Sequence, residues 1–351
     1  MTWTIWKTEF QPACWFLARF QSRRCFSRCE GLVFRRFLII FSLLALLFPA
    51  NAQTTRKFDL HANSPEFWKL IDHRAKLTRV ATGFGFTEGP VWDESGFVYV
   101  SDETINKIFR VYLDGRKEEV IALGDPDGNT FDLQHRLIDC ASELRAVIEV
   151  TPEGKYKILA GHYEGKRLNT PNDVVVGPDT ALYFTDPTLD FVAGEKQEVP
   201  FQGVYRLDAK GELKLLTKDL TQPNGLAFSP DGRHLYIDDS EQRNIRVYDF
   251  LPDASLRNGR IFGEEPGVKH DGVPDGMKVD ERGNIFVTGP GGIWIWDPSG
   301  RHLGTILMPE QPANLNWGDK NYRTLYITAT TSVYRLETKT RGFVPYLTKT
   351  K

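Results

Sequence analysis

Short apolar runs separated by polar turns follow one another along most of the chain, in a repeating order. Each repeat begins with a polar residue, continues into an apolar strand, turns, and returns through a second apolar strand. Runs of this length between turn residues are typical of β-strands paired as hairpins. In the six repeats the leading polar residue and the second strand are, in order, Glu88 and 97–100, Asp127 and 136–139, Asn172 and 181–184, Asn224 and 234–237, Asp275 and 284–287, and Asn314 and 324–327.

The leading polar residues are 39, 45, 52, 51 and 39 positions apart. This period matches a four-stranded propeller blade, whereas a β-sandwich, the alternative all-β fold, does not explain it. A third strand follows in most repeats, for example at Lys107–Tyr112 and Gly203–Leu207. The sequence therefore predicts an all-β fold, a six-bladed β-propeller with four-stranded blades. We expect residues 76–82 and 343–347 to be strands that close the ring between the first and last blades.

One apolar run before the repeats suggests lipid contact, at residues 37–48. At about 12 residues it is too short to span a bilayer and suits the core of a signal peptide. Two arginines precede it, and a small-residue cleavage site follows at 50–52. We therefore predict a leader over 1–52 and a single propeller domain over 53–351. The mature protein is expected to be exported, periplasmic or secreted, without stable membrane insertion; an uncleaved anchor is the alternative.

Charge and motif content narrow the functional classes. The 44 Lys and Arg residues nearly balance the 46 Asp and Glu residues, which leaves a formal net charge of −2. This balance gives no electrostatic case for a nucleic-acid or anionic-membrane partner. The sequence also lacks the signatures of serine hydrolases, zincins and P-loop nucleotide enzymes. We therefore expect a small-molecule ligand that is recognised at a local site.

The polar residue that opens each repeat is the strongest candidate for chemistry. The innermost strands of a propeller line its central channel, so equivalent residues lie at one height around the axis. All six are carboxylates or amides, namely Glu88, Asp127, Asn172, Asn224, Asp275 and Asn314. Converging carboxylates repel one another, so we expect one divalent cation among them. Oxygen ligands without His or Cys favour Ca²⁺, with Zn²⁺, Mn²⁺ and Mg²⁺ as alternatives. The turn-forming tendency of Asn and Asp is the competing explanation for the recurrence.

Four segments resemble one known family. They read Phe-Thr-Glu-Gly-Pro-Val-Trp at 86–92, Gly-Lys-Arg-Leu-Asn-Thr-Pro-Asn-Asp at 165–173, Gln-Pro-Asn-Gly-Leu at 222–226 and Val-Pro-Asp-Gly-Met at 273–277. Together they look like the gluconolactonase family, which also takes in the senescence marker protein and luciferin-regenerating enzyme. The resemblance covers nearly all of the predicted mature chain, and it implies a six-bladed propeller of calcium-type, metal-dependent lactonases and esterases.

The resemblance also implies roles for individual residues. Glu88, Asn224 and Asp275 would be metal ligands, and Asp275 would double as the general base. Asn172 would be a fourth ligand or a substrate contact. The chain departs from many similar bacterial members at Ser142, which stands in place of a histidine, and at Asp127, where such members often have asparagine.

We therefore expect a gluconolactonase-like, metal-dependent hydrolase of lactones, in which an activated water attacks a metal-polarised carbonyl. Arg167 is a candidate substrate clamp, and Asp127 and Asn172 are candidate substrate contacts. Two alternatives stay open: a propeller that binds a sugar or another small ligand around a structural Ca²⁺ without turnover, and an esterase or phosphotriesterase that uses the same site. A metal position that opens into a cleft would favour a hydrolase over a binding protein.

Overall fold

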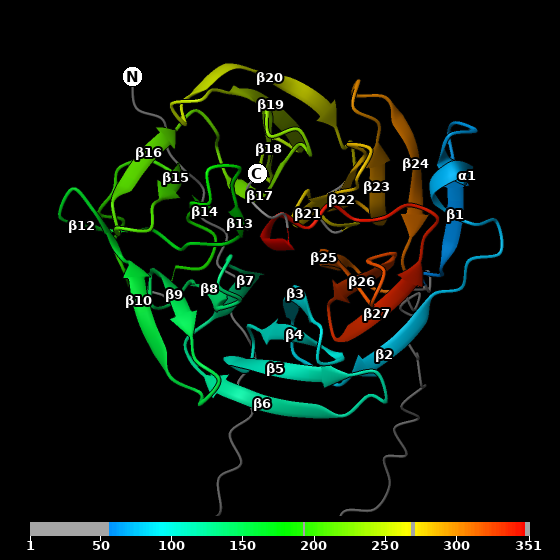
Figure 1. The fold of residues 1–351 in the computed structure, drawn as a ribbon, viewed down its shortest axis with the longest axis horizontal. Helices are drawn as coiled ribbons and strands as arrows, with labels where there is room; N and C mark the ends of the chain where they lie inside the picture. Colours follow the sequence, from blue (N-terminus) through cyan, green and yellow to red (C-terminus); the bar gives the residue numbers. More distant parts are fainter. Residues whose placement is uncertain (1–55, 192–193, 268–270, 348–351) are drawn as a thin grey trace, which may run out of the picture. The chain divides into compact units, whose positions relative to one another are not determined.

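The computed structural model describes residues 56–191, 194–267 and 271–347, and the predicted leader lies outside them. The described residues form one compact unit. In this unit six antiparallel sheets are arranged in a ring around a central axis (Figure 1). The six-bladed β-propeller predicted from the repeats is confirmed. Among the residues described, no helix is long and apolar enough to cross a membrane.

The strands of each blade follow one another from the axis outward. Blade 1 contains β3 (Thr87–Asp93), β4 (Phe97–Asp102), β5 (Lys107–Tyr112) and β6 (Lys117–Ala122); blade 2 contains β7 (Pro126–Phe131), β8 (Leu137–Ala141), β9 (Ala146–Val150) and β10 (Tyr156–Ala160); and blade 3 contains β13 (Val174–Val176), β14 (Leu182–Asp186), β15 (Gly203–Leu207) and β16 (Leu213–Thr217). Blade 4 contains β17 (Pro223–Phe228), β18 (His234–Asp239), β19 (Asn244–Phe250) and β20 (Leu256–Glu264); blade 5 contains β21 (Met277–Val279), β22 (Ile285–Gly289), β23 (Gly292–Trp296) and β24 (His302–Leu307); and blade 6 contains β25 (Pro312–Gly318), β26 (Thr324–Ala329) and β27 (Ser332–Glu337). A short hairpin of β11 (His162–Tyr163) and β12 (Lys166–Arg167) links blades 2 and 3.

Burial decreases from the axis outward. The inner strands β3, β7, β17 and β25 are buried at every residue, because neighbouring blades pack against both of their faces. The outer strand β10 exposes its first three residues. The outer strands β6 and β10 accordingly carry exposed charged residues, whereas the inner strands combine apolar residues with the buried polar residues of the repeats.

Two strands from the beginning of the described chain complete the last blades. β2 (Thr78–Thr82) pairs with β27 and is the outer strand of blade 6. β1 (Asp59–Ala62) pairs with β24 and adds a fifth strand to blade 5. The short helix α1 (Phe67–Leu70) lies between them in sequence. The ring-closing strand predicted within 76–82 is therefore confirmed.

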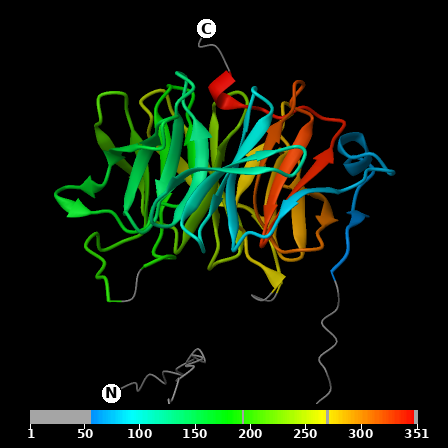
Figure 2. The ribbon, with the colours of Figure 1, turned by 90° about the horizontal axis from the view of Figure 1, so that it is seen from below.

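The second predicted closing strand, at 343–347, is wrong. This segment ends in a 3₁₀ turn, η2 (Pro345–Leu347), because Pro345 has no N–H group with which to continue a sheet ladder. Tyr346 packs against Phe131, with ring centroids 5.5 Å apart. Phe131 is the last residue of β7, so η2 covers the end of the channel away from Asp127 at the start of that strand. Figure 2 shows the turn on one face of the ring.

Candidate active site

The six repeat residues lie at, or just before, the beginning of the inner strands. Four of them belong to β3, β7, β17 and β25, while Asn172 and Asp275 each lie two residues before the first residue of β13 and β21. Five are buried, and Asp275 is partly exposed. The predicted register is therefore confirmed, and it brings these residues to one end of the channel.

Glycines allow the inner strands to converge at this end. A glycine follows four of the six repeat residues, at positions 89, 128, 225 and 276. A side chain on Gly225 would collide with the backbone oxygen of Asp275, and one on Gly276 would collide with Asn314 in the next blade. Because only glycine leaves this space, these four inner strands lie directly against the repeat residue of the next blade.

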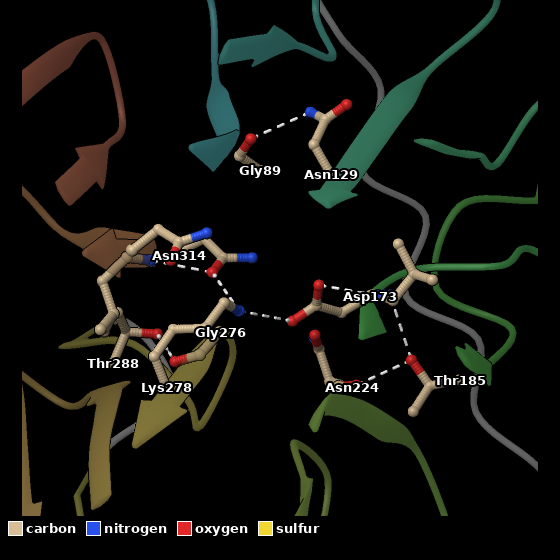
Figure 3. A network of polar contacts seen from close by, with 12 residues as sticks. Gly89, Asn129, Asp173, Thr185, Asn224, Gly276, Lys278, Thr288 and Asn314 are labelled. Carbon is tan, nitrogen blue, oxygen red and sulfur yellow. Dashed lines mark hydrogen bonds and ion pairs between the residues drawn. The ribbon is translucent and has the colours of Figure 1, made fainter. Parts of the chain in front are cut away.

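Blade 3 breaks this pattern with Asp173 in the glycine position. Its carboxylate accepts a hydrogen bond from Lys278 Nζ at 3.4 Å, and Nζ also donates to Asn314 Oδ1 at 3.5 Å. Figure 3 shows the Lys278 ammonium between the two. The sequence analysis did not single out Lys278, although an ionisable residue in a short inner strand was a usable signal. Among the described residues Lys278 forms an ion pair with Asp173 alone, so the other carboxylates still need a counter-charge.

A cavity of about 520 Å³ opens at this end of the channel, and all four predicted ligands line it: Glu88, Asn172, Asn224 and Asp275. Its wall also includes acidic, hydroxyl and basic groups, among them Glu103, Asp190, Ser240 and Arg243. The candidate metal site therefore faces an open space of a size that accommodates a small molecule.

Hydrogen bonds orient the two amides of this set. Asn172 Nδ2 donates to Asp127 Oδ2 at 2.6 Å, and Asn224 Nδ2 donates to Ser240 Oγ at 3.2 Å. Within the described part of the chain, neither amide oxygen accepts a hydrogen bond. Two amide oxygens thus remain available beside the carboxylates of Glu88 and Asp275. An all-oxygen set of this kind fits a hard divalent cation such as Ca²⁺.

The carboxylates near the cavity are crowded. One oxygen from each of Glu88, Glu103 and Asp127 lies within 4.8 Å of the other two. Burial raises the pKa of Glu88 to about 8, and the charge of Asp173 contributes. Burial also raises the pKa values of Glu103 and Asp127, and the charge of Glu88 adds to both shifts. These groups cannot all ionise without a counter-cation, which is a second indication that a cation belongs here.

The pKa of Asp275 is raised as well, mainly by burial and then by the charges of Glu88 and Asp173. An aspartate in this environment binds a proton more readily than one in water. Since Asp275 also reaches the cavity, it has the access to a bound water that a general base needs.

The raised pKa of Glu88 predicts how the metal-free protein responds to pH. The unfolded chain loses this proton near the ordinary value of 4.5, whereas the folded protein keeps it until about pH 8. The folded state therefore binds more protons between these values, so its stability falls as pH rises. In a chelator we expect the melting temperature to drop by several degrees between pH 5.5 and 7.5. Glu88→Gln should flatten this slope, and a melting temperature that rises over the same window would contradict the assignment.

Two predicted substrate contacts lie outside the cavity wall. The Arg167 guanidinium donates to the backbone oxygen of Leu144 at 3.3 Å and lies 3.6 Å from Glu195, so the structure does not bring it to the site. Asp127 does not line the cavity either, and its carboxylate accepts a hydrogen bond from the amide nitrogen of Asn172, which does.

Arg243 and Glu103 are cavity residues that the sequence analysis missed. Arg243 lies in the loop after β18 and is the one basic residue of the described cavity wall. Glu103 directly follows β4, where the sequence Ser-Asp-Glu ends the strand at the channel mouth. Three polar residues in succession at that point were a signal for Glu103. Arg243 lies in a loop, and no sequence pattern indicated that it would line the cavity.

Ser142 takes part in the backbone structure near the site. Its hydroxyl donates to the backbone oxygen of Pro171 at 2.8 Å, and the side chain is fully buried. Pro171 immediately precedes Asn172. Ser142 therefore supports the peptide that leads to a predicted ligand.

Comparisons with known proteins agree with the motifs. The SMP-30/gluconolactonase/LRE-like region matches residues 86–331. The chain is 34% identical to a gluconolactonase of Zymomonas mobilis, over 80% of this chain and 86% of that protein. It is 27% identical to the pentonolactonase XacC of Haloferax volcanii, over 72% and 84% of the two chains. A gluconolactonase structure from Xanthomonas campestris superposes with a TM-score of 0.74 at 29% identity, covering 81% of this chain and 96% of the other. The resemblance drawn from the four segments is confirmed: the chain belongs to the SMP-30/gluconolactonase/LRE-like family.

Proposed function

We propose that this protein is a lactonase that opens sugar lactones with the help of one divalent cation, which we expect to be Ca²⁺. The observation that carries the proposal is the cavity lined by Glu88, Asn172, Asn224 and Asp275, because it opens a set of metal-binding oxygens to water and substrate. A purely structural ion would be enclosed by protein ligands instead. The gluconolactonase and pentonolactonase relatives support sugar lactones as the substrate class.

Glu88, Asn224 and Asp275 would hold the cation, with Asn172 as the fourth ligand. Glu103 is a further candidate, because its carboxylate lies close to that of Glu88. A bound divalent cation supplies Lewis-acid polarisation of the ester carbonyl. The protein contributes the fixed directions of these oxygens, which the glycines and amide hydrogen bonds set before substrate arrives.

Asp275 would act as the general base. It takes a proton from the attacking water as the new C–O bond forms at the lactone carbonyl. The ring C–O bond then breaks, and the proton passes to the departing ring oxygen, which leaves a hydroxy acid. The oxygen of the Asp275 carboxylate that is not bound to the cation would accept this proton.

The remaining cavity wall suits a ligand rich in hydroxyl groups. The carboxylates of Glu103 and Asp190 face the space as hydrogen-bond acceptors, and Arg243 supplies donors. Such a wall favours sugar lactones over aryl esters, which offer few groups to pair with it.

A substrate panel tests the proposal. The purified protein should be assayed against sugar lactones, aryl esters and a phosphotriester, with and without added Ca²⁺. Metal-dependent hydrolysis that is fastest with sugar lactones is the expected result. Metal binding without hydrolysis of any of these compounds would instead support the binding-protein alternative. Fastest hydrolysis of the phosphotriester would support the phosphotriesterase alternative.

Arg243→Ala is expected to raise KM for a sugar lactone about tenfold, because the substrate loses hydrogen bonds from a charged donor. The matched control is Arg167→Ala, which removes an arginine that contacts Leu144 and Glu195 and should leave KM within about twofold. Steady-state kinetics of both variants separates the two assignments. A larger effect of Arg167→Ala would restore the prediction that Arg167 clamps the substrate.

A further inference from the structure

We infer that Ser240 is a positioning residue of the metal site, which holds the Asn224 amide in the orientation that presents its carbonyl oxygen to the cation. This inference rests on the metal-binding part of the proposed function. It concerns how the site is preorganised and does not depend on which lactone is hydrolysed.

Ser240 makes two hydrogen bonds of opposite direction. It follows β18, is 3% exposed, and lines the cavity. Its hydroxyl donates to the backbone oxygen of Pro274 at 2.7 Å and accepts from Asn224 Nδ2 at 3.2 Å. A hydroxyl has a single proton to donate, and a carbonyl oxygen only accepts. Since the proton is directed to Pro274, the Ser240 oxygen faces Asn224 as an acceptor.

This direction determines which end of the Asn224 amide faces Ser240. If the amide were turned by 180°, its oxygen would lie against the Ser240 oxygen, whose proton is already used. The amide nitrogen therefore stays on Ser240, and Oδ1 stays on the other side of the amide. The two orientations of an asparagine have nearly the same shape, so packing alone does not select between them. The hydrogen bond to the Ser240 oxygen therefore selects the orientation of the Asn224 amide.

The same hydroxyl also reaches a second predicted ligand through the backbone. Pro274 immediately precedes Asp275, so the bond to its carbonyl restrains the peptide from which Asp275 projects. Asn224 comes from blade 4, and Asp275 begins blade 5. Ser240 thus connects ligands of two neighbouring blades.

Ser142 repeats only half of this arrangement and so provides a matched control. It donates to the backbone oxygen of Pro171, which precedes Asn172, in the same way that Ser240 donates to Pro274. The Asn172 amide nitrogen, however, donates to Asp127 and not to Ser142. Comparing the two serines separates orientation of an amide ligand from support of a proline carbonyl.

The test is calorimetric titration of the purified protein with Ca²⁺, with melting temperatures measured in chelator to show that each variant is folded. Ser240→Ala should weaken Ca²⁺ binding about tenfold, because the amide loses the partner that selects its orientation. Ser240→Thr retains a hydroxyl and should bind within about threefold of the unaltered protein. Ser142→Ala should also stay within about threefold.

Several results would overturn the inference. These are unchanged Ca²⁺ affinity in folded Ser240→Ala, an equal loss in Ser142→Ala, or no Ca²⁺ binding by the unaltered protein. If Ser240→Ala does not fold, Ser240→Cys keeps the size of the side chain with a weaker acceptor, and its affinity must then fall below that of Ser240→Thr. Lactone turnover is measured separately: Ca²⁺ binding that depends on Ser240 without any turnover would reject the lactonase proposal and leave this inference in place.

Discussion

Asp275→Asn is expected to lower turnover of a sugar lactone by roughly 10²- to 10⁴-fold while Ca²⁺ still binds. The amide keeps an oxygen that can bind the cation, but it cannot accept the proton of the attacking water. Asp275→Ala should abolish hydrolysis and also weaken metal binding, because it removes the ligand together with the base. Steady-state kinetics and calorimetric titration with Ca²⁺ distinguish the two variants.

Asn224→Ala is the matched control for this pair. It removes a predicted ligand that has no proposed role in proton transfer, so its loss of activity should follow its loss of Ca²⁺ affinity and recover at high Ca²⁺ concentration. Near-normal turnover by Asp275→Asn would show that another group accepts the proton, even if the metal site is assigned correctly.

Removing the cation should have an equally large effect on activity and a second effect on stability. Incubation with a chelator is expected to lower lactone turnover at least about 100-fold, because polarisation of the carbonyl is lost. At a Ca²⁺ concentration about 1,000 times Kd, binding to the folded state alone stabilises it by about 4 kcal/mol. The chelator should therefore also lower the melting temperature by roughly 6 °C.

Adding back Ca²⁺, Mg²⁺, Mn²⁺ or Zn²⁺ singly identifies the ion that restores each property. Recovery of stability without recovery of activity would indicate an ion that binds but does not support hydrolysis. Full activity in protein shown by elemental analysis to be metal-free would reject the metal-dependent mechanism.

The repeats made most of the fold and part of the site predictable. In every blade the inner strand is buried on both faces and the outer strand on one face. The same pattern of apolar and polar residues therefore recurs in the sequence of each blade. The repeats selected six residues at the same place in the six blades, and the four ligands implied by the family resemblance are among these six. The closing strand within 76–82 was predictable for a similar reason, since a propeller protects the edge of its last sheet.

The residues that sequence reasoning missed lie outside this repeat register. Arg243 belongs to a loop, where no period constrains the side chain, and Lys278 follows Asp275 at a depth of the channel where the other blades carry no equivalent charge. Ser240 was missed because its role depends on the direction of a hydrogen bond. The error at 343–347 arose from reading apolar composition without the missing N–H of Pro345. The spacing of the repeats carries no information on the backbone chemistry of a single proline or on the direction of one hydrogen bond, so these features could not be predicted from it.

Pairing of β2 with β27 and of β1 with β24 has a consequence for the order of folding. Thr78 lies opposite Arg335 and Asp59 opposite Leu307, so the partners are separated by more than two hundred positions. β1 and β2, the first strands of the described chain, can therefore pair only after nearly all of the chain has been synthesised. Contacts of such sequence separation slow folding, since the intervening chain must be ordered first. If these contacts form after the rate-limiting step of folding, they mainly slow the opening of the folded ring. β1 and β2 would then affect the lifetime of the folded protein more than the rate at which it folds.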